Sequence, residues 1–249
     1  MNERGVHAQT ALPVSQKQVY QHQQAWLSLN SFMRFNANWG MLADAHMRRE
    51  NFMADPYFYL LRIGAAFWIK QKIPVAGGYA HLWQAPKNGW NTWQNENRIF
   101  QQWSVSGREG KTGFMQRIRT EQRWKEEIID DQKTGAMTFS FRLRSLSSFE
   151  FCFSNTVRVP RLVLSDEILV QFGQSVSMNP FDQNRFFVGL KFNLNADLSC
   201  DIGYMNTIQQ RSSIYEFDKS DVFRLFFYYT PDFRMKQPDR LIQIYENTE

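Results

Sequence analysis

The chain has 249 residues, of which 43% are hydrophobic and 16% aromatic, with a formal net charge of +5 and a mean hydropathy of −0.50. No apolar run reaches the roughly 18 residues of a membrane-spanning helix, since the nearest, 57–69, is interrupted by Arg62, so helical spans are excluded. Basic residues are interspersed with acidic ones and form no lysine-rich block or zinc-ligand spacing, which argues against nucleic-acid binding.

The first residues of the chain are too few and too polar for a signal peptide. Val6-His7-Ala8 nevertheless has the small-x-small pattern of a signal cleavage site, although such triplets are common by chance. We therefore interpret residues 1–24 as a segment that precedes the folded domain, a remnant of a signal peptide plus leader whose apolar stretch was lost upstream.

Residues 113–124 alternate between charged and apolar side chains with a period of two, and residues 39–50 and 223–229 repeat the pattern. This is the period of a β-strand. A soluble β-sandwich rarely carries rows of arginine and glutamate along its solvent-exposed face. A barrel that spans a bilayer, in contrast, has lipid outside and a polar interior. The pattern predicts an all-β protein, an antiparallel up-and-down transmembrane β-barrel.

The same alternation predicts eleven strands in chain order. They are 25–36, 39–50, 57–70, 74–84, 93–104, 113–125, 137–149, 162–172, 181–193, 196–208 and 221–230. Tight turns are expected at 36–38, 72–74 and 193–195, and long polar connections at 84–92, 126–136 and 209–220. Alternating short and long connections are typical of an up-and-down barrel.

A single-chain bacterial barrel is expected to have an even number of strands, so the prediction is about twelve, with a range of roughly 10 to 14. The missing strand falls either in 14–24, which is rich in glutamine, or in 233–245, despite Pro238. The barrel is accordingly predicted to span 25–233, and residues 234–249 are predicted to be a C-terminal tail or the last strand.

The charged residues of the alternating strands are predicted to face the lumen, because an arginine facing lipid at the bilayer midplane costs ~2–4 kcal/mol. The predicted lumen residues are Asp44, Arg48, Glu50, Arg62, Glu96, Arg98, Arg117, Arg119, Glu121, Arg123, Arg142, Arg144, Glu167, Arg185, Asp201 and Arg224. Ten of them are arginines and six are acidic, so the lumen carries an excess of positive charge.

Two functions compete for these residues. Arginines and carboxylates of neighbouring strands can form an ion-pair network that fills a narrow barrel, or the excess arginines can line a small conduit that favours anions. Glu96 and Arg98, like Arg119 and Glu121, stand two residues apart on one face, so acids and arginines are expected to pair. This pairing favours the ion-pair network over the conduit. The alternative to a membrane barrel is a soluble β-sandwich or a lipocalin-like carrier.

Catalysis and metal binding have little support in the sequence. A hydrolase would have to use His46 or His81, because His7 and His22 precede the predicted strands, and no nucleophile elbow accompanies any of the four. Metal-ligand spacings and phosphate-binding glycine loops are absent, so neither a metal nor another cofactor is expected.

The glycines of Gly77-Gly78-Tyr79 and Gly203-Tyr204 lie within predicted strands, where they are expected to allow a bend or a close backbone approach. Cys152 and Cys200 lie among apolar alternating residues, and we expect them to be unpaired small hydrophobic residues rather than a disulfide.

Several short motifs follow one another along the chain. They are Trp93-x-x-Glu96-Asn97-Arg98-x-x-Gln101-Gln102, Arg117-x-Arg119-x-Glu121-x-Arg123, Phe141-Arg142-x-Arg144, Asp166-Glu167, Gln183-Asn184-Arg185 and Gly203-Tyr204-Met205-Asn206. In this order, over residues 26–233, the chain resembles the bacterial family known as domain of unknown function 2490. The resemblance implies an outer-membrane β-barrel of a Gram-negative bacterium, in contact with outer-membrane lipid, and it implies no activity. Small anionic solutes or a partner protein are the remaining expected partners. The chain departs from the family pattern in lacking a full signal peptide and in its tail, 234–249.

Overall fold

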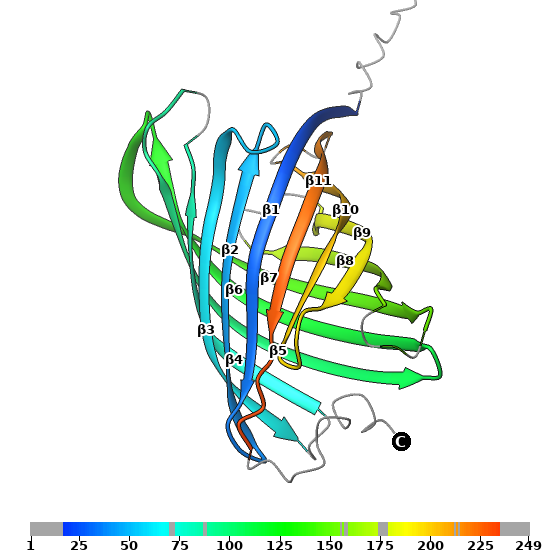
Figure 1. Cartoon of the computed structure of the whole chain (residues 1–249). Coiled ribbons are helices and arrows are strands. Elements are labelled where there is room, and N and C mark those ends of the chain that lie inside the picture. Colours follow the sequence, from blue (N-terminus) through cyan, green and yellow to red (C-terminus); the bar gives the residue numbers. More distant parts are fainter. Residues whose placement is uncertain are drawn as a thin grey trace, which may run out of the picture.

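The fold is a closed β-barrel, seen in a computed structural model that describes residues 17–69, 73–86, 89–154, 156, 159–173, 179–211, 213 and 215–234 (Figure 1). The strands are β1 (Gln18–Arg34), β2 (Trp39–Glu50), β3 (Asp55–Ile69), β4 (Ile73–Gln84), β5 (Gln94–Glu109), β6 (Thr112–Ile129), β7 (Gln132–Cys152), β8 (Arg161–Phe172), β9 (Phe181–Asn193), β10 (Leu198–Gln210) and β11 (Glu216–Tyr229). The prediction of an all-β barrel is confirmed. Within the described residues no helix is long and apolar enough to cross a membrane.

The barrel has eleven strands, within the predicted range of 10 to 14, and the odd number determines how it closes. Each strand pairs antiparallel with its neighbours in sequence, whereas β1 and β11 pair in parallel from Gln18↔Glu216 to Ser31↔Tyr229. These two strands, blue and orange in Figure 1, lie side by side. The number of strands is therefore odd, not the even number that was expected. In an up-and-down barrel with an odd number of strands, the first and last strands run in the same direction and pair in parallel. The antiparallel order holds for every other pair.

The first strand begins earlier than expected. β1 starts at Gln18, so part of the segment 14–24 extends the first strand instead of forming a separate one. The other candidate for a further strand, 233–245, lies mostly outside the described residues, as do the triplet Val6-His7-Ala8 and most of the predicted tail.

The predicted long loop at 126–136 is wrong. β6 and β7 continue as a paired hairpin to Ile129↔Gln132 and are joined by a two-residue turn, Asp130-Asp131. Both turn residues have positive φ, 50° and 60°, a conformation that aspartate tolerates and that suits a tight hairpin turn. The polar composition of residues 126–136 predicts a loop, but it is equally compatible with paired strands. This part of the hairpin extends beyond the residues that pair with β5 and β8, so both of its faces are polar.

The turn residue Asp131 also joins this hairpin to the connection between β4 and β5. Its carboxylate accepts hydrogen bonds from the backbone N–H groups of Asn91, at 3.0 Å, and Thr92, at 2.7 Å. These two donors hold the pKa of Asp131 below its ordinary value of 3.8. The junction is therefore fully formed above that value and is lost as the pH falls through the lowered pKa.

We expect Asp131→Asn to weaken this junction at neutral pH, because an amide is a poorer acceptor for the two N–H groups than a carboxylate. Hydrogen exchange at the amides of Asn91 and Thr92 should become several-fold faster. Asp130→Asn is the matched control, since no hydrogen bond of its side chain is seen among the described residues. Equal acceleration in both variants would contradict the assignment.

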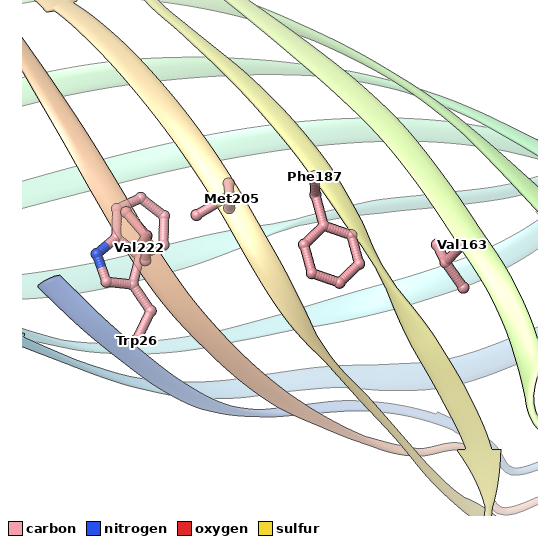
Figure 2. Packing of buried hydrophobic residues seen from close by; sticks show 5 residues of the cluster. All are labelled: Trp26, Val163, Phe187, Met205 and Val222. Carbon is pink, nitrogen blue, oxygen red and sulfur yellow. The ribbon is translucent and has the colours of Figure 1, made fainter.

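Side chains alternate between the two faces of the barrel wall. Buried apolar residues form two clusters: Trp26, Val163, Phe187, Met205 and Val222, shown in Figure 2, and Leu42, Ala66, Trp68, Ala76 and Phe100. The first draws on β1 and on β8–β11, and the second on β2–β5. Cys152 and Cys200 are both free thiols, as expected.

Candidate functional site: the charged barrel interior

The interior of the barrel holds a network of charged side chains. Eleven of the sixteen predicted lumen residues are buried, and Arg48, Glu50, Arg117, Arg123 and Arg224 are half-buried. Ion pairs between strands that are not neighbours, such as that between Arg117 on β6 and Glu167 on β8, place these groups inside, because side chains on the convex outer face of a barrel diverge. The alternation seen in the sequence thus corresponds to the two faces of the wall.

Glu121 on β6 is the first centre of the network. It is 1% exposed and accepts hydrogen bonds from Arg142 Nε at 3.0 Å and from Arg144 Nη1 at 2.9 Å. Arg98 and Arg119 approach the same carboxylate at 3.7 and 4.0 Å. A carboxylate with two oxygens and about four lone-pair sites can serve several guanidinium groups at once, so Glu121 neutralises a cluster of arginines that would otherwise repel one another.

Glu167 on β8 is the second centre. It accepts hydrogen bonds from Arg117 and Arg144, each at 2.8 Å, and from Arg185 at 3.0 Å. Because Arg144 also contacts Glu121, the two carboxylates share one guanidinium and form a single network across β6–β9. Such charge-assisted, partly bidentate bonds fix both the position and the orientation of each arginine.

Glu96 on β5 is the third centre and lies towards the other end of the network. Arg98 Nε donates to it at 2.7 Å, and Arg123 donates to both of its oxygens. Arg98 links this centre to Glu121. The spacing of Glu96 and Arg98 in the sequence therefore does correspond to a direct ion pair, whereas Arg119 and Glu121, also two apart, approach only to 4.0 Å.

Two further ion pairs between predicted lumen residues stand apart from this network. Arg62 donates to Asp44 at 2.7 Å, between β3 and β2. Arg224 and the hydroxyl of Tyr228 both donate to Asp201, at 3.0 and 2.9 Å. These pairs occupy the part of the interior that faces β1–β3 and β10–β11.

Arg48 and Glu50 are not brought into the network. Arg48 forms no ion pair with the described residues and lies against two rings, with its Cζ 3.2 Å from the centroid of Trp26 and 4.2 Å from that of Phe58. Both residues line a pocket at one rim of the barrel. The pocket is lined by His22, Gln24, Trp26, Arg48, Glu50, Tyr57, Gln183, Thr207, Gln209, Asp218 and Ser220.

Phe100 on β5 separates the wall from the guanidinium groups on one side of the interior. The Cζ atoms of Arg62 and Arg119 lie 5.3 and 5.6 Å from its ring centroid, within cation–π range. Its ring packs over the paired glycines Gly64 and Gly78, since a Cβ at Gly64 would lie 2.9 Å from the ring. An aromatic ring placed over wall glycines fills the space that their absent side chains leave.

Phe187 on β9 repeats this arrangement on the other side. Arg224 lies 4.0 Å from its ring centroid, and the ring covers the paired glycines Gly189 and Gly203. Phe187 is 1% exposed and stands between Met205 and Val163 in Figure 2. The expectation that Gly78 and Gly203 allow a close backbone approach agrees with this packing, because a Cβ at Gly203 would also overlap the carbonyl oxygen of Val188.

Sequence reasoning missed three polar partners of the network. Asp182 pairs with Arg142 at 3.2 Å, while the amide oxygens of Gln102 and Gln183 accept hydrogen bonds from Arg119 and Arg185. Gln102 and Gln183 share the alternation of the charged residues, so that pattern could have found them. Asp182 could not be found in this way, because a bulge opposite Leu169 and Val170 turns two consecutive residues of β9 inward.

The histidines among the described residues lie on both faces of the wall. His22, expected to precede the strands, lies within β1, where its Nε2 is 2.8 Å from Asp218. His81 lies on the outer face and contacts Asn97 at 2.9 Å, because the neighbours Ala80 and Leu82 take the buried positions. His46 does lie inside, 4.0 Å from Asp44. No group of three or more His, Cys, Asp or Glu suited to a metal ion occurs among the described residues.

The predicted lumen residues hold more cations than anions: their ten arginines face six carboxylates of the same set and Asp182. Arg161 and Lys191, which share Glu150, add to the excess of positive charge on the inner face. Several buried nitrogen atoms have no hydrogen-bond partner among the described residues, including Nε of Arg62, Arg117 and Arg224.

Comparison with known proteins identifies a family. The family model described as "Protein of unknown function (DUF2490)" matches residues 23–217, which include most of β1, all of β2–β10 and all of the network's acidic centres. A search of curated proteins and a search of solved structures found no match.

Proposed function

The chain belongs to the DUF2490 family of proteins of unknown function, and from this premise we propose that it is an outer-membrane β-barrel of a Gram-negative bacterium. Its interior is filled by the ion-pair network, and it acts as a structural or partner-binding membrane protein without catalytic activity. The network supports this role, because paired arginines and glutamates occupy the space that an open channel would need.

The observation that carries the proposal is the distribution of polarity across the wall. The interior holds the charges, whereas large apolar side chains cover much of the outer face, with Leu61 and Ile63 on β3 exposed by 55% and 56%. Aromatic pairs lie near the strand ends, as in Trp39 with Phe67 and Tyr59 with Trp93. An apolar outer band between aromatic girdles is the signature of a barrel in lipid, and such a surface in water favours aggregation.

Membrane fractionation and heat-modifiable migration test the proposed location. We expect the full chain to fractionate with outer membranes, to require detergent for solubility, and to migrate differently in gels before and after boiling. A stable monomer in buffer without detergent would instead support a soluble carrier and would contradict the proposal.

A second candidate function is a narrow conduit that favours anions, and the excess of arginine favours it. Planar-bilayer recordings separate the two functions. If the network closes the lumen, the wild-type barrel should give no steady conductance. Anion-selective steps that are reduced by Arg119→Ala or Arg142→Ala would establish the conduit. Arg119 is the sharper probe, because its direct hydrogen bonds go to a neutral amide, Gln102, whereas Arg142 neutralises Glu121.

A further inference from the structure

Arg48 and Glu50 are the two predicted lumen residues without an ion pair to any residue that the structure describes. Both are half-buried, lie two residues apart on the inner face of β2, and line the pocket at the rim of the barrel. Their spacing does not keep them apart, because Glu96 and Arg98 have the same spacing on β5 and form a direct ion pair at 2.7 Å. The other contacts of each side chain therefore decide that these two do not meet.

Two aromatic rings hold the Arg48 guanidinium. Trp26 of β1 and Phe58 of β3 are its direct neighbours on the two sides of β2, and the Arg48 Cζ atom lies 3.2 and 4.2 Å from their ring centroids. The rings attract the cation but accept none of its five N–H donors in an ordinary hydrogen bond. These donors make no hydrogen bond to another described side chain or backbone group. Such a fork of donors suits a planar carboxylate.

A short chain of hydrogen bonds positions Glu50 beside Arg48. The indole Nε1–H of Trp26 donates to Gln24 Oε1 at 2.8 Å, and the Gln24 amide donates to Glu50 Oε1 at 3.4 Å. Trp26, labelled in Figure 2, and Gln24 are 3% and 4% exposed, so both belong to the packed wall. One indole thus contacts Arg48 through its ring and orients Glu50 through its N–H group.

The other charged side chains at this pocket are already paired. Asp218 accepts a hydrogen bond from Arg211 at 2.6 Å and contacts His22 at 2.8 Å. Arg185 of β9, which lies against the same indole ring, donates to Glu167 at 3.0 Å. The described lining of the pocket therefore presents one cation and one anion whose charges no neighbouring group neutralises.

We propose that the rim pocket binds a small zwitterion of the amino-acid class, with the carboxylate of the ligand on Arg48 and its ammonium group on Glu50. Residues two apart on one face of a strand are separated by about 6.6 Å, a distance that the two charged groups of an α-amino acid can bridge with a hydrogen bond at each end. A ligand with one charge would leave the other side chain uncompensated.

The size of the pocket limits the ligand. Its unfilled volume is about 10 Å³, close to the minimum that admits one small group, which favours the smallest members of the class. The site uses only residues of the inner face, so it does not depend on the proposed membrane location.

Calorimetric titration of the full chain in detergent tests the site, with glycine as the probe. We expect saturable binding of glycine. Acetate, which lacks the ammonium group, and methylammonium, which lacks the carboxylate, should each bind at least about tenfold more weakly. Acetate that binds as tightly as glycine would overturn the proposal in favour of a simple anion site, and the lack of a saturable signal with glycine would overturn it outright.

Two variants assign the two ends of the ligand. Glu50→Gln should weaken glycine binding by about tenfold or more without weakening acetate binding, and Arg48→Gln should weaken glycine binding as much without weakening methylammonium binding. Glu109→Gln and Lys111→Gln, at the opposite end of the barrel, are the matched controls and should bind glycine as the wild type does. Wild-type affinity for glycine in either pocket variant would refute the assigned contact and with it the zwitterion site.

A third variant, Arg48→Lys, separates binding from folding. Lysine keeps a cation between the rings but lacks the planar fork, so its affinity for glycine should lie between those of the wild type and Arg48→Gln. The heat-modifiable fraction of each sample shows whether the barrel is folded. If Arg48→Lys and Arg48→Gln are both folded and bind glycine equally weakly, the cation does not hold the carboxylate and the proposal fails.

Discussion

Glu121→Gln is expected to destabilise the barrel by about 3–5 kcal/mol, the usual cost of removing one partner from a buried ion pair. Glu121 is among the least exposed charged residues, at 1%, and it neutralises Arg142 and Arg144 directly. Glutamine keeps the shape of the side chain but not its charge, so the two guanidinium groups would remain buried with their excess charge uncompensated. The urea midpoint of tryptophan fluorescence in detergent, together with the heat-modifiable fraction, measures the loss.

The matched control for this variant is Glu109→Gln. Glu109 lies exposed at the end of β5, next to the β5–β6 turn, so its substitution should change stability by no more than about 0.5 kcal/mol. If the two variants were equally stable, the network would not be held together by the charge of Glu121. An increase in stability on Glu121→Gln would point to a carboxylate that is kept for a purpose other than folding.

Gly78→Ala should be a strongly damaging small substitution in the wall, with a loss of about 3 kcal/mol or more. A Cβ at Gly78 would overlap the carbonyl oxygen of Ile63 and the Cα of Gly64 on β3. Backbone atoms cannot move aside as a flexible side chain can, so β3 and β4 would have to separate where Phe100 packs over them. The folded yield in detergent and the urea midpoint report this effect.

Gly77→Ala is a control one residue away on the same strand. Its nearest contact would be the carbonyl oxygen of Phe100 at 3.5 Å, an ordinary van der Waals distance. We expect a change within about 0.5 kcal/mol. Equal damage from both variants would mean that the glycines matter through backbone freedom in β4, not through the close approach of β3 and β4.

The faces of the strands could be predicted from the sequence because the signal is local. Side chains of a strand alternate between two faces with a period of two, so the positions of Arg117, Arg119, Glu121 and Arg123 relative to Ile118 follow from spacing alone. The assignment of side chains to the two faces does not require the pairing register between strands to be known, as long as the strand has no bulge. It fails where a bulge occurs, as at Asp182, which the alternation could not place inside.

The partners inside the barrel could not be predicted in the same way. Spacing suggested that Glu121 pairs with Arg119, but the tighter partners are Arg142 and Arg144 of the next strand. Which side chains meet depends on the register between strands and on how far the wall curves, and both are properties of the closed barrel. The extent of the β6–β7 hairpin also escaped prediction, because polar paired strands and polar loops look alike in sequence.

The sequence alone therefore determined the all-β class and the shared side of the predicted lumen residues, eleven of which are buried, since both follow from a two-residue period. Tertiary structure alone decided the strand number, the parallel pairing of β1 with β11, and the convergence of arginines on Glu96, Glu121 and Glu167. The physical reason is that closure of the barrel pairs strands that are far apart in the chain, such as β1 and β11. The local pattern of residues in one strand does not determine which distant strand pairs with it.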